Sequence, residues 1–315
     1  TSQNNEQREL GEMRILYGIV GEGMGHATRS RVVLDHLLSA GHEIKVVVSN
    51  RAYSFLSKLY NNSPGISIQR IHGLNLAYKG NAMSKRESLQ LNLRRAPGGI
   101  QQNYRAYRKV VGSFSPDLVI SDFDSWAYLY ALRHRLPIIS IDNMQVLNRC
   151  KHDSFVTANR SLAFRLAKAA VKVKLPGADH YLISSFFMPP VHKSRSTLVP
   201  PILRPEILGA KRQPGDHVLV YQTQAANRKL IKTLRTMPYE FRVYGLNREG
   251  RCGNITFRPF SQQGFIDDLR TAKAVIAGGG YSLMGEAVHL RVPMLSMPLK
   301  GQYEQELNAR YLQKL

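Results

Sequence analysis

The stretch Met13–Ser30, MRILYGIVGEGMGHATRS, decides how the first half of the sequence is interpreted. Its apolar beginning predicts a buried β-strand, and the alternating glycines Gly21, Gly23 and Gly25 predict a tight turn. The residues from His26 to Ala40 then follow a helical pattern that ends at a glycine. A strand, a glycine turn and a helix in this order are typical of a parallel α/β sheet that brings its backbone close to a ligand.

Strand-like and helical segments alternate along the rest of the chain. The strand-like runs are continuously apolar, as strands buried on both faces of a parallel sheet are. A proline-rich stretch, 188–207, interrupts the alternation and predicts a connection between domains. The predicted strands cover residues 13–20, 43–49, 117–122, 136–142, 217–223, 241–245, 255–260, 273–280 and 292–299.

This pattern predicts two doubly wound, Rossmann-like α/β domains that face each other across a cleft. We assign residues 1–12 to a flexible tail, 13–200 to an N-terminal domain and 201–315 to a C-terminal domain. The sequence stops inside its last predicted helix, so we expect the C-terminal domain to extend beyond Leu315.

Composition limits the class of protein. The chain has 315 residues, is 43% hydrophobic and contains only two cysteines, which favours a folded protein in a reducing, cytoplasmic environment. No apolar run approaches the roughly 18 residues of a membrane span. Lys and Arg number 44 against 22 acids, and this net charge of +22 predicts a polyanionic partner. Nucleic acid, anionic lipid and phosphorylated substrates all satisfy that expectation.

His26 and Asp122 are the candidate catalytic residues. His26 follows the first strand, and Asp122 follows the strand at 117–122, so both are expected at the carboxyl edge of one sheet. A carboxylate that holds one imidazole nitrogen leaves the other as a general base. The alternatives are that His26 only caps the helix and that Asp122 is an N-cap or turn residue, with Asp124 as its competitor.

A second glycine turn follows the strand at 273–280. Gly278, Gly279 and Gly280 lead directly into a helix with Ser282 in its first turn, an arrangement that suits a pyrophosphate. Glu286, one turn further on, is placed to bind ribose hydroxyls, or else lies on a solvated helix face. The next helix begins with polar residues that suit a hydroxyl-rich ligand: Glu304, Gln305 and Asn308.

From about Met13 to Leu315 the chain resembles GT-B glycosyltransferases of the family 28 type. Relatives of that type include the MurG-type enzyme of peptidoglycan synthesis, monogalactosyldiacylglycerol synthases and UDP-glycosyltransferases. The resemblance rests on GEGMGHATRS in the first domain and, more closely, on FIDDL (265–269), the second glycine turn and the EQELN segment (304–308) in the second.

The resemblance implies a UDP-sugar site in the second domain. Phe265 and Ile266 would lie near the uracil ring, and Glu286 would bind the ribose. Arg204, in PILRPE, corresponds to the arginine of the family's NPVR-like motif. The remaining implied donor contacts serve the diphosphate or the sugar: Gly279, Gly280, Tyr281, Ser282, Thr223, Gln224, Glu304, Gln305 and Asn308.

Two departures from the family pattern affect the expected site. The segment YQTQAA, which contains Thr223 and Gln224, lacks the glycines of the family's GGSQGA loop. Glu22 places an acid near the transfer site where MurG-type enzymes have a smaller residue. Both departures leave the identity of the sugar open.

The resulting expectation is an inverting, metal-independent hexosyltransferase whose only cosubstrate is a nucleotide-sugar. His26 would deprotonate an acceptor hydroxyl, and Asp122 would support the imidazolium. The alternatives are a nucleotide-sugar hydrolase or 2-epimerase of the same fold, and a basic nucleic-acid-binding protein, for which the chain shows no helix-turn-helix, zinc-finger or RRM signature.

The acceptor is expected to be a lipid or polyprenyl-linked molecule, with the protein peripheral on the inner face of a membrane. Segment 161–177 has no acid and mixes basic with apolar residues, as a helix on an anionic bilayer does. A core-packing helix with a charged outer face is the alternative. The basic residues of this segment are Arg165, Lys168, Lys172 and Lys174.

Overall fold

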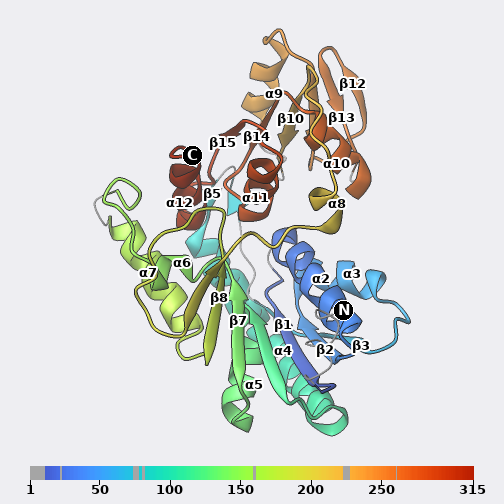
Figure 1. Cartoon of the computed structure of the whole chain (residues 1–315), viewed down its shortest axis with the longest axis vertical. Coiled ribbons are helices and arrows are strands. Elements are labelled where there is room, and N and C mark those ends of the chain that lie inside the picture. The colour runs from blue at the N-terminus through green and yellow to red at the C-terminus, as the bar shows by residue number, and fades with distance from the viewer. Residues whose placement is uncertain are drawn as a thin grey trace, which may run out of the picture. The chain divides into compact units, whose positions relative to one another are not determined.

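The computed structural model describes residues 11–315, apart from 22, 74–77, 80–81, 159–160, 223–227 and 260. The chain forms two compact units, each built on its own sheet (Figure 1). The first comprises Thr1–Asn75, Leu89–His152 and Arg165–Ile202, and the second comprises Leu76–Ser88, Asp153–Phe164 and Leu203–Leu315. Two short segments from the predicted N-terminal domain therefore group with the second unit.

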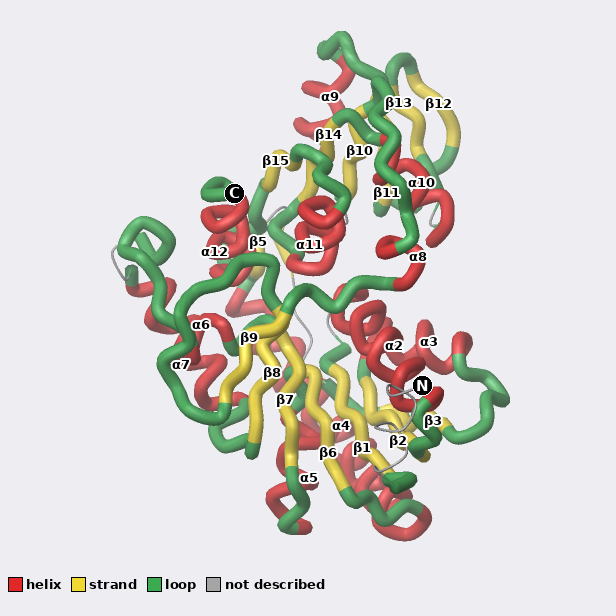
Figure 2. The backbone as a smooth tube through the Cα atoms, viewed as in Figure 1, coloured by secondary structure: helices red, strands yellow, loops and turns green. Residues whose placement is uncertain are grey.

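The first unit is a seven-stranded parallel sheet in the order β3-β2-β1-β6-β7-β8-β9, drawn in yellow in Figure 2. Its strands are β1 (Arg14–Ile19), β2 (Glu43–Val48), β3 (Ile66–Arg70), β6 (Leu118–Asp122), β7 (Ile138–Asp142), β8 (His180–Ser184) and β9 (Ser196–Val199). Its helices are α2 (Met24–Ser39), α3 (Asn50–Leu59), α5 (Ser125–His134), α6 (Val146–Arg149) and most of α4 (Lys85–Ser113) and α7 (Leu162–Lys174).

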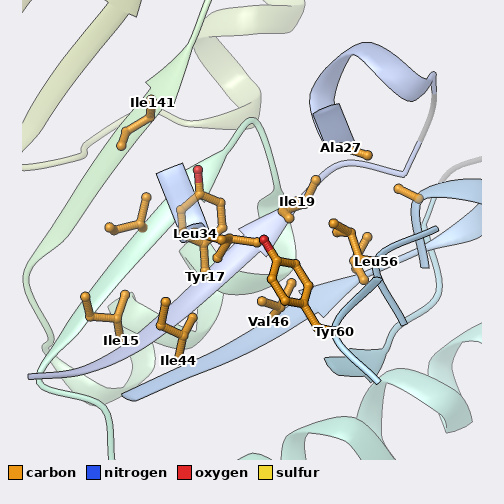
Figure 3. Close-up of a cluster of buried hydrophobic side chains, with 13 residues drawn as sticks. Ile15, Tyr17, Ile19, Ala27, Leu34, Ile44, Val46, Leu56, Tyr60 and Ile141 are labelled. Atoms are coloured by element: carbon orange, nitrogen blue, oxygen red, sulfur yellow. The ribbon is translucent and has the colours of Figure 1, made fainter. Parts of the chain in front are cut away.

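Alternate residues of β1 point to opposite faces of this sheet. Ile15, Tyr17 and Ile19 pack with residues of α2 and α3, such as Leu34 and Leu56, in a fully buried cluster (Figure 3). Fully burying one such aliphatic side chain contributes about 1.5–3 kcal/mol. Strand β1 is thus fixed in the middle of the sheet with its carboxyl end at a defined edge.

Helices α4 and α5 cover the other face. A Cβ on Gly18 of β1 would lie only 2.4 Å from Cβ of Ala127, so α5 packs directly on the strand there. Tyr107 of α4 packs against α5 through its ring and its hydroxyl, which lies 3.1 Å from Nε2 of His134. The end of α7 meets the start of α5, because the Ser125 hydroxyl donates to the Lys174 carbonyl.

The second unit is a six-stranded sheet in the order β12-β13-β11-β10-β14-β15, parallel except for the pair β12–β13. Its strands are β10 (Val218–Tyr221), β11 (Phe241–Tyr244), β12 (Gly250–Cys252), β13 (Ile255–Phe257), β14 (Ala274–Ala277) and β15 (Met294–Ser296), and β4 (Tyr78–Lys79) and β5 (Ala82–Met83) form a separate hairpin. Its helices are α8 (Pro205–Leu208), α9 (Arg228–Arg235), α10 (Gln262–Thr271), α11 (Tyr281–His289) and α12 (Tyr303–Leu312).

Six strands were not predicted from the sequence, namely β3, β4, β5, β8, β9 and β12. Strand β9 lies inside the proline-rich stretch, where Ser196–Val199 pairs with β8 between the prolines. Strand β12 is only three residues long, all three are exposed, and it pairs at the edge of the second sheet. Short edge strands carry little apolar patterning, because one side of each is open to solvent.

Candidate active site

The candidate catalytic pair lies at the carboxyl edge of the first sheet. His26 is in the first turn of α2, directly after β1, and Asp122 is the last residue of β6. These two strands are parallel neighbours. The chain adds β2 and β3 on one side of β1 and then crosses back to add β6 on the other side, so the order in which strands are added reverses between β1 and β6. Such switch points are where parallel sheets place functional groups. Nδ1 of His26 lies 2.8 Å from Oδ1 of Asp122, so the structure brings the two predicted residues together.

The first glycine turn places His26 without using it as a cap. A Cβ on Gly21 would lie 2.2 Å from the carbonyl oxygen of Ser49, so only glycine fits this close approach. Gly23 has a φ of 86° and is the N-cap of α2, and Gly25 lies within the helix. The alternative in which His26 caps the helix is therefore wrong, and its imidazole is available for other contacts.

The Asp122 carboxylate is fully buried and accepts hydrogen bonds from three side chains of α2. Besides His26, the Ser30 hydroxyl donates to Oδ2 at 2.8 Å, and the Arg29 guanidinium contacts both oxygens, with Nε 3.2 Å from Oδ2. Burial alone would raise the pKa of Asp122, but Arg29 and His26 hold this pKa down at about 2. The carboxylate stays ionised and can orient an imidazole that carries its proton on Nδ1.

Arg29, Ser30 and Asn143 were missed by sequence reasoning. Nη1 of Arg29 donates to Oδ1 of Asn143 at 2.9 Å, and Nη2 lies 2.9 Å from Nδ1 of His26. Arg29 and Asn143 are both buried. A signal was present in the sequence, because His26, Arg29 and Ser30 have the i, i+3, i+4 spacing of one helix face.

Asp124 has a different role from Asp122. Its side chain accepts from the Ala127 backbone N–H at 2.8 Å and caps the N-terminus of α5. Burial raises the pKa of Asp124 to about 6. The capping role that the sequence left open for Asp122 therefore belongs to Asp124.

The second glycine turn follows β14, whose neighbour β10 lies at the switch point of the second sheet. Gly280 is the N-cap of α11 and has no side-chain cap, Tyr281 is the first helical residue, and Ser282 follows it. The positive end of the helix dipole and the first-turn amides are features that favour an anion. Gly279, one residue earlier, is buried against α12.

Glu286 and Arg204, both predicted donor contacts, are paired with each other. Nε of Arg204 donates to Oε1 of Glu286 and Nη2 donates to Oε2, both at 2.9 Å. Both side chains are mostly buried. Burial raises the pKa of Glu286, and the Arg204 guanidinium opposes this rise. Glu286 is therefore not on a solvated helix face.

The other predicted donor residues lie in α10 and α12. The ring of Phe265 is half-buried and contacts the rings of Tyr221 and Tyr244 edge-on. Ile266 is in the core, so a side-chain contact with a base rests on Phe265 alone. Glu304, Gln305 and Asn308 lie in the first turns of α12, where Gln305 and Asn308 bind the backbone of the second glycine turn. Thr223, Gln224 and Glu22 lie outside the described residues.

The predicted membrane-facing helix is α7, and its four cations differ in exposure. Arg165 and Lys172 are exposed, whereas Lys168 and Lys174 are half-buried. Nζ of Lys174 lies 4.1 Å from the centre of the Phe123 ring. Of the five large apolar residues in this helix, two pack into the protein and three are exposed; the buried ones are Phe164 and Val171, and the exposed ones are Leu162, Leu166 and Val173.

In the part of the chain that the structure describes, no three His, Cys, Asp or Glu side chains gather as a metal site would require. No helix among these residues is long and apolar enough to cross a bilayer.

Known proteins resemble this chain over nearly its full length. The family model "Glycosyl transferase family 1" matches residues 13–315. An uncharacterized glycosyltransferase of Methanosarcina acetivorans is 26% identical over 335 residues, which cover 96% of this chain and 84% of the relative.

Solved structures agree in fold. The crystal structure of LpCGTa in complex with UDP matches with a TM-score of 0.64 at 16% identity, over 96% of this chain and 83% of the other. MurG of Acinetobacter baumannii matches with a TM-score of 0.53 at 13% identity, over 96% and 84%. The two α/β units are those of a GT-B glycosyltransferase, as the sequence predicted, and the chain belongs to glycosyl transferase family 1.

Proposed function

We propose that this protein transfers a sugar from a UDP-sugar to an acceptor hydroxyl and inverts the anomeric centre. The observation that carries the proposal is the hydrogen bond between His26 and the buried, ionised Asp122 at the switch point of the first sheet. A histidine held in this way, with its second nitrogen free to accept a proton, has the arrangement of a general base.

The proposed reaction is a single displacement. Nε2 of His26 takes the proton of the acceptor hydroxyl as its oxygen forms a bond to the anomeric carbon. The bond from that carbon to the diphosphate oxygen breaks, and UDP leaves with the electron pair. Attack from the side opposite the leaving group inverts the configuration. Asp122 stabilises the imidazolium without taking its proton, because its pKa is about 2.

The proposed donor site is the second glycine turn. The N-terminus of α11 would receive the diphosphate and stabilise its charge as UDP leaves, so the scheme uses no metal and no cofactor besides the donor. Phe265 would lie near the base, and Glu286, oriented by Arg204, would bind the ribose. The UDP bound to the structurally similar LpCGTa supports uridine as the nucleotide.

Ligand binding and one substitution test this function. In a thermal-shift screen of UDP, GDP and dTDP, UDP at about 100 times its dissociation constant should stabilise the protein by about 2.7 kcal/mol. The variant His26→Ala should bind UDP as the wild type does, yet release UDP from a UDP-sugar and acceptor about 10²–10⁴ times more slowly. A variant that keeps its full rate would show that His26 is not the base.

Incubation of UDP-sugars without an acceptor separates the proposed transfer from other reactions of this fold. A transferase should release little UDP in that incubation, whereas a hydrolase or a 2-epimerase should convert the donor unaided. Acceptor-independent turnover equal to the rate with acceptors would replace the transferase proposal by one of these two.

A second proposal concerns where the acceptor is found. Helix α4 carries large, exposed apolar residues that are four or seven positions apart, so they lie on one face of the helix. Their exposed fractions run from 45% to 71%, so the stripe faces solvent and does not pack in the core. The residues of this stripe are Leu89, Leu93, Ile100, Tyr104 and Val111.

The neighbouring helices α5 and α7 also carry exposed aliphatic side chains. Leu129 and Leu132 of α5, and Leu166 and Val173 of α7, are more than half exposed. Helices α4, α5 and α7 together hold twelve Lys and Arg against a single acid, Glu87. Exposed aliphatic side chains between cations have the chemistry of a protein that lies on an anionic bilayer.

We therefore propose that α4, α5 and α7 bind an anionic lipid surface and that the acceptor is a lipid or polyprenyl-linked hydroxyl. The protein would then be peripheral at the cytoplasmic side of a membrane. Charge alone would equally suit nucleic acid, but nucleic-acid surfaces use aromatic and polar contacts more than exposed leucines.

A further inference from the structure

The segment that ends α6 and the loop that precedes β9 lie side by side in the first unit. The Lys151 N–H donates to the Pro190 carbonyl at 2.8 Å, and the His192 N–H donates to the Arg149 carbonyl at 3.0 Å. These backbone contacts bring the basic residues of one segment next to those of the other. Lys193, which follows His192 in the loop, therefore lies close to the end of α6 as well.

Neutral groups hold two of these cations in place. Nζ of Lys193 donates to Oδ1 of Asn148 at 2.6 Å, and Asn148 is only 2% exposed. The Arg149 guanidinium lies 3.7 Å from the centre of the Tyr181 ring, and its Nη2 donates to the Ser194 carbonyl at 2.6 Å. An amide, an aromatic ring and a carbonyl carry no net charge, so these contacts fix both cations without neutralising them.

Helix α7 brings further cations to the same place. Lys168 and Lys172 are four positions apart and share one face of the helix. Burial and then nearby cations lower the pKa of Lys193, and both of these lysines are among those cations. Burial and then Lys168 lower the pKa of His192. Cations from three segments thus repel one another at short range. This basic cluster consists of Arg149, Lys151, Lys168, Lys172, His192 and Lys193.

The loop that carries Lys193 lies at a different edge of the sheet from the candidate catalytic pair. Arg149 stacks on Tyr181, the second residue of β8, and Tyr181 pairs with Ser196, the first residue of β9. Arg149 therefore marks the amino ends of these two strands, whereas His26 and Asp122 lie at the carboxyl edge. Substrates of open α/β sheets bind at the carboxyl edge, so the basic cluster has another task.

We propose that the basic cluster is a binding site for a phosphate group, separate from the catalytic pair and from the proposed UDP site. A phosphate monoester carries a charge of about −1.5 to −2 at pH 7 and offers three strong acceptor oxygens. Several ammonium groups can donate to those oxygens at once, and the bound anion offsets the repulsion among the cations. The phosphate belongs either to a soluble phosphorylated molecule or to a lipid headgroup. This inference goes beyond the proposed transfer reaction and does not depend on it.

NMR of the His192 imidazole tests the inference, with inorganic phosphate as the probe and His192→Gln to assign the signal. Phosphate at pH 7 should move the His192 signal to a saturating end point. A pH titration with and without the probe should show that phosphate raises the pKa of His192 by about one unit, because a bound anion favours the protonated ring. The signal of His36, an exposed residue in the last turn of α2, should not move.

Matched substitutions distinguish a built site from general attraction. Lys193→Gln should weaken phosphate binding about tenfold, because a charge-assisted hydrogen bond is lost. Lys58→Gln removes one exposed cation of α3 in the same unit and should bind phosphate as the wild type does. If Lys193→Gln does not fold, the exposed Lys151 replaces it, since Lys151→Gln should show a similar loss. The absence of saturating movement of the His192 signal, or equal weakening by the cluster and control substitutions, would overturn the inference.

Two phosphate monoesters identify the source of the phosphate. Glycerol 3-phosphate and dihexanoyl phosphatidic acid present the same group, without and with acyl chains. Equal affinities for the two would support a soluble phosphorylated ligand, and binding of the lipid at least tenfold more tightly would support a headgroup. Failure of the wild type to bind UDP would contradict the proposed function and would leave the phosphate site standing, since the two are measured separately.

Discussion

One face of helix α2 carries the side chains that surround the Asp122 carboxylate. His26, Arg29 and Ser30 all contact it, and it is fully buried. A buried carboxylate without a cation would be strongly destabilising, so Arg29 has a structural task besides any effect on catalysis. The same arginine holds the carboxylate to which Nδ1 of His26 donates, so the position of the imidazole depends on Asp122 and, through it, on Arg29.

Arg29→Met tests how far the site depends on that cation. The substitution leaves Asp122 buried and without its ion pair, so the free energy of unfolding should fall by about 3–5 kcal/mol. Urea unfolding measures this loss. Arg29→Lys, which keeps the charge but loses the two-pronged contact, should be destabilised less and should remain folded for rate measurements of transfer.

Arg31 in the same helix supplies the matched control. It pairs with Asp35 over one helical turn at the surface, at 3.3 Å. Such pairs contribute about 0.3–0.5 kcal/mol, so Arg31→Met should scarcely change stability or transfer. Equal effects of the Arg29 and Arg31 substitutions would contradict the role assigned to Arg29.

At the scale of elements, two carboxylates only two residues apart respond oppositely to their surroundings. Asp122 ends β6 beside a guanidinium and has a lowered pKa, whereas Asp124 caps α5 and has a raised one. The β-strand sends successive side chains to opposite faces, and the turn after it adds a further change of direction. At the end of β6, Asp122 thus belongs to the candidate catalytic site, whereas Asp124, two residues later, caps a helix.

Asp124→Asn should change how stability depends on pH. The folded-state pKa of Asp124, about 6, lies above the ordinary value of 3.8 for this carboxyl, so the wild type gains stability as pH falls from about 6 towards 4. Asn keeps the cap but cannot ionise, so the variant should lack this gain and be more stable than the wild type at pH 7, by about 1–3 kcal/mol. Melting temperatures at pH 7 and pH 5 measure the difference.

Asp179 offers the control for that comparison. It is exposed and accepts from the Ile138 backbone N–H at 2.9 Å, so Asp179→Asn removes a carboxylate with a similar bond but without burial. The difference between pH 5 and pH 7 should then match the wild type. The same pH profile for the wild type and for Asp124→Asn would show that burial does not govern this cap.

The alternation of apolar runs was sufficient to predict the parallel sheets, because buried parallel strands need continuous hydrophobic sequence. It was also sufficient to predict that His26 and Asp122 approach each other, since both follow strands at one sheet edge. Strand β9 was missed because prolines flank it, and β12 because its three residues are exposed. Arg29 and Ser30 could not be predicted as partners of Asp122, because this contact depends on which face of α2 points at the end of β6. Their spacing from His26 becomes informative only once the position of α2 is known.

The pairing of Glu286 with Arg204 shows a further limit. The two residues are 82 positions apart, and the family resemblance gave each a separate ligand role. Their mutual contact depends on how the loop before α8 passes α11, which no local pattern encodes. The same applies to Gln305 and Gly279, which meet only because α12 packs against the turn after β14.

At the scale of the whole molecule, the net charge of +22 is distributed unevenly among its surfaces. The helices α4, α5 and α7 carry cations and exposed leucines with almost no acid, whereas α10 and α12 carry acids as well as cations. A protein that used its charge only for solubility would have no need to concentrate it beside apolar residues. This distribution favours a lipid-binding surface on α4, α5 and α7 of the first unit.

Sedimentation with lipid vesicles tests that face. The wild type should sediment with vesicles that contain phosphatidylglycerol and should stay in solution with pure phosphatidylcholine. Replacing four exposed cations by glutamine should release it, because each contributes on the order of 1 kcal/mol near an anionic surface, screened by salt. The four are Arg94, Arg105, Arg108 and Lys172.

A control with the same change in net charge removes four exposed cations of the second unit, namely Lys211, Lys232, Arg248 and Lys300. This variant should still sediment with the anionic vesicles, since among the described residues the exposed apolar stripe beside cations lies on α4 of the first unit. Leu93→Ser with Ile100→Ser, which leaves the charge unchanged, should also weaken binding, because these exposed side chains would enter the lipid interface. The membrane proposal would be contradicted if both charge variants left the vesicles equally and the serine substitutions had no effect. The net charge would then serve a general attraction for polyanions, and the acceptor would be a soluble molecule.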